Sequence, residues 1–194
     1  MQEEIFDVVD ENDEVIRAAG RKEVHVERLM HRAVHILVFD EQGRLLVQLR
    51  GFNKDCSPGL LDTSAGGHVS SGETYGQAAV RELQEELGIC GADELEFVAK
   101  LPASEATGQE FVSIYKTTTS EIPILQQSEL AAAVWVSLER LKAWIKRDRS
   151  QFTTVFLKIC EEQGLIYALT CTAFQLRRAV MARQYTSQIS FAGQ

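Results

Sequence analysis

One segment constrains this chain more than any other, a predicted helix that follows residues 71–74 and ends before Gly88. Apolar residues recur in it at helical spacing, and Gly88 stands where a glycine commonly ends a helix. The same helix carries glutamates at positions i, i+3 and i+4, so their side chains share one face. These residues are Glu82, Glu85 and Glu86.

Carboxylates crowded in this way repel one another, and the repulsion lowers helix stability unless a cation neutralises it. Carboxylate oxygens are the hard ligands that Mg²⁺ and Mn²⁺ prefer. Arg81 stands next to the acidic face, where it can pair with a glutamate and fix its rotamer. Taken singly, each of these features is also typical of an ordinary solvated helix.

The combination is more specific than its parts. Gly67, Glu73 and the run Arg81–Ile89 occupy every fixed or class-restricted position of the Nudix box. The chain therefore resembles the Nudix hydrolases over most of its length. The resemblance implies an α+β fold, an α/β/α sandwich with a mixed sheet. It also implies Mg²⁺- or Mn²⁺-dependent hydrolysis of a diphosphate linkage in a nucleoside diphosphate derivative.

The resemblance also implies roles for residues of the box. Glu82, Glu85 and Glu86 become metal ligands, and the backbone carbonyl of Gly67 becomes a further one. Glu85 or Glu86 would also help to activate water, and Arg81 would orient the glutamates. The remaining box residues are structural, namely Glu73 and Gly88.

The first ninety residues are similar to a narrower branch, the type 1 isopentenyl-diphosphate isomerases and the Nudix hydrolases related to them. Those isomerases hold a second metal on histidines and glutamates. His31 and His68 match two of the histidine positions, and Glu110 matches one glutamate. The third histidine position falls at Val24 or His25. Hydrogen bonding at a loop–strand junction is the alternative role for His31 and His68.

Two positions depart from the isomerase pattern. The other metal-binding glutamate would fall at Gly108, and the catalytic cysteine would fall at Gly66. Proton transfer at carbon needs a paired acid and base, and glycine offers neither. The sequence therefore favours hydrolysis over an isomerase-like activity. A non-catalytic nucleotide-sensing Nudix module is a further alternative, which the intact set of box glutamates disfavours.

Candidates outside the box are less specific. Arg50 and Lys54 flank a loop that should border the pocket, where they would contact a substrate phosphate or remain solvated. Glu129 stands where many Nudix enzymes place an extra carboxylate for metal or water. His35 lies within an apolar strand, which favours a hydrogen-bonded residue of the core or cleft.

The rest of the chain completes one α+β domain over residues 1–150. Its expected strands are 4–9 and 14–18, forming an N-terminal hairpin, then 33–40, 44–50, 63–65, 95–101, 109–117 and 133–136, with a helix at 138–147. Residues 151–194 are expected to form a helical extension packed on this domain, which either lines the pocket or forms a homodimer interface.

Composition excludes several function classes. The formal net charge is -8, whereas proteins that bind duplex nucleic acid usually present a basic surface. No apolar run is long enough to span a membrane, and the acidic N-terminus lacks the pattern of a secretory signal. We therefore expect a cytoplasmic enzyme whose partner is a small-molecule diphosphate.

Overall fold

The computed structural model describes residues 3–90 and 95–165. The chain divides into two compact units, Met1–Ile159 and Cys160–Gln194, and the site lies in the first. The expected second helix of the C-terminal tail falls outside the described residues. Within the described part of the chain, no helix is long and apolar enough to cross a membrane.

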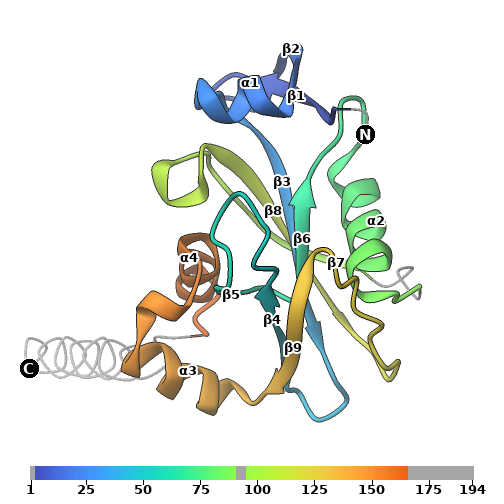
Figure 1. Cartoon of the computed structure of the whole chain (residues 1–194), viewed down its shortest axis with the longest axis vertical. Helices are drawn as coiled ribbons and strands as arrows, with labels where there is room; N and C mark the ends of the chain where they lie inside the picture. Colours follow the sequence, from blue (N-terminus) through green and yellow to red (C-terminus); the bar gives the residue numbers. More distant parts are fainter. Residues whose placement is uncertain (1–2, 91–94, 166–194) are drawn as a thin grey trace, which may run out of the picture. The chain divides into compact units, whose positions relative to one another are not determined.

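A mixed sheet forms the centre of the first unit (Figure 1). Among the described residues it has seven strands, in the order β5-β4-β3-β8-β7, with β6 paired to β3 and β9 to β4. Strands β3 and β8 run parallel, and the other pairs are antiparallel. The strands are β3 His31–Phe39, β4 Leu45–Arg50, β5 Leu61–Asp62, β6 Ala65–His68, β7 Glu96–Leu101, β8 Glu110–Thr118 and β9 Leu130–Val136.

The predicted box helix is α2, Tyr75–Leu87. Thr74 caps its N-terminus in a reciprocal capping box with Gln77, and Gly88 ends it in the left-handed conformation at φ 65°. Its apolar face packs on one face of the sheet and forms the main core. Core residues of α2 and β3 include Ala79, Leu83, Leu87, Val34 and Ile36.

Helices α3 (Leu138–Arg147) and α4 (Thr154–Glu162) lie on the side of the sheet opposite α2 (Figure 1). Phe152, just before α4, forms a parallel bridge with Leu61 of β5. The backbone N–H of Thr153 donates to the Leu61 carbonyl at 2.9 Å, which fixes the start of α4 beside β5. The mixed sheet with helices confirms the predicted α+β class.

The N-terminal hairpin consists of β1, Ile5–Val9, and β2, Val15–Gly20, as predicted. It continues directly into α1, Arg21–Val26, a helix that the sequence analysis did not predict. Six residues are too few to show a helical period, and in α1 Val24 is the buried residue. Val24 joins a small separate core with Phe6, Val8 and Ala19.

Short segments around the box also differ from expectation. Of the predicted strand 63–65, Thr63 and Ser64 form the connection between β5 and β6, and Ala65 begins β6. Gly66 and Gly67, expected in a loop, lie in β6 and pair with His35 and Val34 of β3. Glycine lowers strand propensity, so composition alone suggests a turn here.

A buried carboxylate joins the hairpin to the sheet. Asp13 lies at the hairpin turn with φ 64°, and its side chain accepts hydrogen bonds from Arg32, Tyr75 and Lys100. Arg32 donates from Nε at 2.6 Å and Tyr75 from its hydroxyl at 2.9 Å. These bonds connect the hairpin to β3, α2 and β7, and they lower the pKa of Asp13 although burial opposes the shift.

Replacing Asp13 with Asn is expected to lower the free energy of unfolding by about 1–3 kcal/mol, because Arg32 and Lys100 lose their shared anion. Asparagine tolerates the left-handed backbone, so the change tests the charge and not the turn. Urea denaturation measures the loss. Glu11→Gln, an exposed change in the same turn, is the control and should have no effect.

Candidate active site

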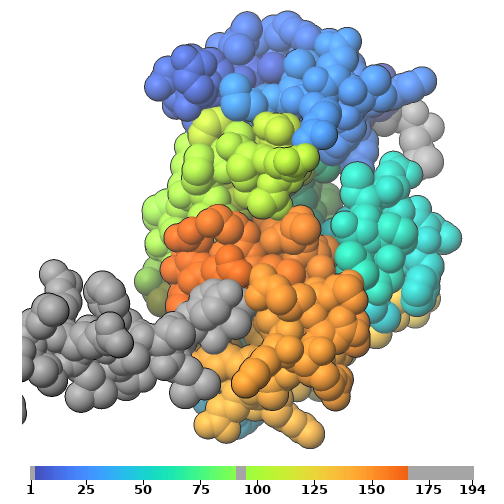
Figure 2. Space-filling model, turned by 90° about the vertical axis from the view of Figure 1, so that its left-hand side faces the viewer, coloured from blue at the N-terminus to red at the C-terminus, as the bar shows by residue number. Residues whose placement is uncertain are grey.

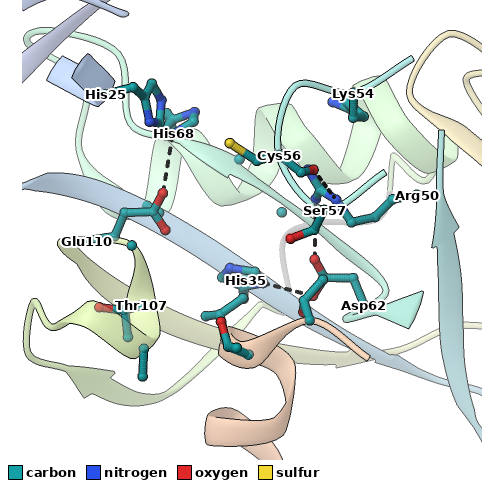
Figure 3. Close-up of a pocket in the computed structure, with 18 of the residues that line it drawn as sticks. His25, His35, Arg50, Lys54, Cys56, Ser57, Asp62, His68, Thr107 and Glu110 are labelled. Carbon is teal, nitrogen blue, oxygen red and sulfur yellow. Dashed lines mark hydrogen bonds and ion pairs between the residues drawn. The ribbon is translucent and has the colours of Figure 1, made fainter. Parts of the chain in front are cut away.

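A cavity of about 210 Å³ opens beside β6, on the α4 side of the sheet. Its walls come from α1, β3, the end of β4 with the β4–β5 loop, β5, β6, the segment that leads into β8, and the start of α4. In Figure 2 these blue, teal, lime and orange segments surround a recess. Labelled lining residues in Figure 3 include His25, His35, Arg50, Lys54, Asp62, His68 and Glu110.

Two glutamates of α2, Glu82 and Glu86, lie against the glycines of β6 that line this cavity. Glu86 is 4% exposed, and its Oε2 accepts from the backbone N–H of Gly66 at 3.1 Å and from Gln48 Nε2 at 3.4 Å. Burial, together with repulsion from Glu82, raises the pKa of Glu86 to about 8. Burial also raises the pKa of Glu82. A cation bound next to Glu82 and Glu86 would therefore stabilise the ionised forms of both carboxylates.

Gly67 makes the close approach of Glu82 feasible. A Cβ atom at this position would lie 2.2 Å from Glu82 Oε1, so any side chain would displace the carboxylate. Gly67 therefore forms a cradle for Glu82 between β6 and α2. Carboxylate oxygens are the hard ligands that Mg²⁺ and Mn²⁺ prefer. Glu82, lying against the backbone of Gly67, therefore suits the cation that the Nudix box implies.

Arg81 contacts three glutamates of the box and the backbone of β6. It donates twice to Glu73, from Nε at 3.0 Å and Nη2 at 2.9 Å, and once to the His68 carbonyl at 3.0 Å. Its Nη1 lies 2.6 Å from Glu82 Oε1 and 3.3 Å from Glu85 Oε2. These carboxylates raise the pKa of Arg81 above its ordinary value.

Glu85 is placed differently from its two neighbours. Its side chain is 62% exposed and contacts Arg81 at the flank of α2, whereas Glu82 and Glu86 face the glycines of β6. A role for Glu85 in binding metal stays a prediction. Gly88 and Glu73 hold the structural positions described above.

Three histidines meet at the other end of the cavity. The ligand atoms of His25, His31 and His68 lie within 4.8 Å of one another, and each Nε2 is buried without a hydrogen-bond partner. Glu110 Oε1 lies 3.3 Å from His68 Nε2 and 3.6 Å from His31 Nε2, at ion-pair distance but outside hydrogen-bond geometry. Figure 3 shows the carboxylate below His68.

Charges around this cluster are strongly shifted. Burial, reinforced by the neighbouring histidines, lowers the pKa of His25 to about 4. Burial alone would raise the pKa of Glu110, but the two adjacent histidines outweigh it and lower that pKa. Imidazoles that converge on one carboxylate are the donor set of transition metals such as Zn²⁺ and Mn²⁺. His25, and not Val24, therefore completes the cluster.

Two further candidates from the sequence, Arg50 and Glu129, differ in their position relative to the cavity. Arg50 lines the cavity, where Nη1 pairs with Asp62 Oδ2 at 3.3 Å and Nη2 donates to the Cys56 carbonyl at 3.1 Å. Glu129 lies outside the cavity lining and forms an ion pair with Lys54, which does line it. Asp62 was missed by sequence reasoning, because nothing marks a lone aspartate after a leucine pair.

Comparison with known proteins identifies the family. The NUDIX domain model matches residues 29–156. The chain belongs to the Nudix family. An uncharacterised Nudix hydrolase of Yersinia pestis is 34% identical over 163 residues, covering 76% of this chain and 89% of that protein. The isopentenyl-diphosphate Delta-isomerase of Serratia proteamaculans is 35% identical over 167 residues, covering 84% and 92%.

Solved structures agree with this assignment. DR0079 from Deinococcus radiodurans has a TM-score of 0.66 at 31% identity, covering 75% of this Nudix chain and 90% of that one. The NUDIX domain of Shewanella oneidensis NrtR, solved with ADP ribose, has a TM-score of 0.54 at 16% identity and covers 68% and 84%. That second likeness concerns the fold alone.

Replacing Gly67 with Ala is expected to weaken Mn²⁺ binding at least about tenfold, because the new methyl group takes the place of the Glu82 carboxylate. Unfolding temperature should change little, since the displaced atoms end a flexible side chain. Titration followed by Mn²⁺ electron paramagnetic resonance measures the affinity. Gly76→Ala, whose Cβ would meet only the Tyr115 hydroxyl at 4.0 Å, is the matched control.

Stabilisation of the protein by Mg²⁺ should grow with pH. The pKa of Glu86 is raised to about 8 from an ordinary 4.5. The contribution of protonated Glu86 to the free energy of unfolding is therefore complete below about pH 4.5, and it is lost as pH rises through about 8. Mg²⁺ binds the ionised form and has fewer protons to displace at high pH. The rise in unfolding temperature on adding Mg²⁺ should be larger at about pH 8.5 than at about pH 6. Equal shifts at both would contradict the assignment, and Glu86→Gln should remove the difference.

Proposed function

We propose that this Nudix protein hydrolyses the diphosphate linkage of a nucleoside diphosphate derivative with the help of Mg²⁺ or Mn²⁺. The observation that carries the proposal is the contact of Glu82 and Glu86 with two glycines of the cavity wall. This contact supports a cation site beside a cavity that Arg50 and Lys54 also line. The full set of box glutamates supports hydrolysis over ligand sensing.

Opposing charges around the cavity suit a diphosphate. Arg50 and Lys54 line it and present N–H donors that phosphate oxygens accept. Lys54 forms an ion pair with Glu129, and the carboxylates of Glu86 and Glu82 also attract it. A divalent cation bound by the glutamates would neutralise charge on the phosphates and lower the pKa of a water molecule. The diphosphate would then lie between the side chains of Arg50 and Lys54 and the carboxylates that bind the divalent cation.

Isomerase activity is the second candidate, because relatives named isopentenyl-diphosphate isomerases match the chain as well as relatives named hydrolases do. The histidine cluster favours it, but Gly66 opposes it. A Cβ atom at Gly66 would lie 2.9 Å from the Val34 carbonyl oxygen and 3.0 Å from His35 Nδ1. A cysteine at this position would not fit without movement of the β3 backbone or of His35.

A substrate panel tests the proposal. ADP-ribose, nucleotide sugars, dinucleotide cofactors, nucleoside triphosphates and coenzyme A are incubated with the protein and Mg²⁺ or Mn²⁺. We expect two phosphate-containing products from at least one of them. Conversion of isopentenyl diphosphate to its isomer, with no cleavage in the panel, would support the second candidate. Binding without turnover of either kind would support a sensor.

Replacing Glu86 with Gln should lower kcat on the substrate so identified by about 100-fold or more, because the position loses its negative charge while keeping its shape. Unfolding temperature should fall little or rise, since a neutral amide avoids the cost of a buried charge. Glu139→Gln, an exposed change on α3, is the control. Near-normal turnover of the Glu86 variant would contradict the assignment.

A further inference from the structure

One polar residue of the cavity has no part in either proposed metal site. His35 lies in the middle of β3, directly opposite Gly66 of β6, and is 7% exposed. Its ring lies in the cavity between Glu110 and Asp62 (Figure 3). A buried histidine that lines a cavity is either a structural hydrogen-bonding group or a residue that handles protons.

The space above Gly66 is filled by this imidazole. The Cβ direction of Gly66 points at His35 Nδ1, 3.0 Å away, so the ring stands where a side chain at position 66 would begin. The backbone N–H of the same glycine donates to Glu86 Oε2. His35 and Glu86 therefore lie against the same glycine, His35 at its Cβ position and Glu86 at its backbone N–H.

Hydrogen bonding fixes the tautomer of His35. The hydroxyl of Thr63 has one proton, which it donates to the Ala65 carbonyl at 3.2 Å. With that proton directed to Ala65, the Thr63 oxygen, 2.7 Å from His35 Nδ1, accepts from it. Nδ1 therefore carries the proton, and Nε2 carries a lone pair. Nε2 has no partner among the residues that the structure describes.

Charges around the ring come from four strands. Asp62 of β5, whose Oδ1 lies 3.9 Å from Nδ1, and Glu110 of β8 favour the protonated ring. Arg50 of β4 and His68 of β6 oppose it. Burial is the largest influence and lowers the pKa of His35, so the ring is neutral and able to accept a proton near pH 7.

We propose that His35 Nε2 is the base that removes a proton from the water that attacks the diphosphate. This inference rests on the hydrolysis proposed above. One O–H bond of the water breaks and its proton goes to Nε2, while its oxygen forms a bond to phosphorus. The P–O bond to the leaving phosphate breaks, and that phosphate keeps the electron pair. Asp62 and Glu110 stabilise the imidazolium until the proton passes to solvent.

The tautomer is tested on the wild-type protein without substrate. Nitrogen-15 NMR of the labelled histidine rings distinguishes a protonated Nδ1 from a protonated Nε2, and the His35 signals are assigned by their loss in His35→Asn. We expect a neutral ring at pH 7 with the proton on Nδ1. A proton on Nε2, or a ring charged at pH 7, would overturn the inference whatever the activity.

Kinetics test the role with the substrate from the panel. His35→Asn should lower kcat by about 100-fold or more and remove the acidic limb of the pH–rate profile, with KM and Mn²⁺ affinity within about threefold of the wild type. Added imidazole should restore part of the rate. Activity of the variant within threefold of wild type would overturn the role of His35 while leaving the proposed function in place.

A matched pair at Thr63 separates the tautomer from the packing. Thr63→Ser keeps the hydroxyl and should preserve the rate, whereas the isosteric Thr63→Val removes the acceptor that holds the proton on Nδ1 and should slow turnover. Equal rates for the two variants would contradict the inference. A wild-type protein that cleaves nothing in the panel would overturn the proposed function and this inference together.

Discussion

The site depends on the close contact between helix α2 and the two glycines of β6. Glu82 approaches β6 because Gly67 leaves room for its carboxylate, and Glu86 accepts a hydrogen bond from the backbone N–H of Gly66. Core packing of α2 on β3 brings the two elements together, and the contact buries charge that the protein alone does not neutralise. Burial of carboxylates at a cost in stability is typical of a ligand-binding site.

The N-terminal hairpin helps to position one residue of the histidine cluster. It leads into α1, which carries His25 to the two histidines of β3 and β6. Asp13 ties the hairpin turn to three other elements through Arg32, Tyr75 and Lys100. Contacts at a distance from the cavity therefore help to set the position of His25, and the hairpin lies in the same compact unit as the cavity.

Local patterns in the sequence predicted what depends on local geometry. The glutamates of α2, their Arg81 partner and the Gly88 cap follow from helical spacing, and the hairpin follows from alternation. The placement of His25 and His35 depends on a six-residue helix and on strand pairing between distant segments, which no local pattern encodes. Asp62 was missed for the same reason, since its role arises from its contact with Arg50.

Strand pairing has a consequence for how such a protein can vary. Strands β3 and β8 pair in parallel over nine residues, and this register sets His31 opposite Glu110. A shift of β8 by one residue would turn Glu110 to the opposite face of the sheet. Insertions and deletions between β7 and β8 are therefore tolerable where they lengthen or shorten the connection at 102–109. An insertion or deletion inside β8 would separate Glu110 from His31 and His68, although the hydrophobic composition of the chain would not change.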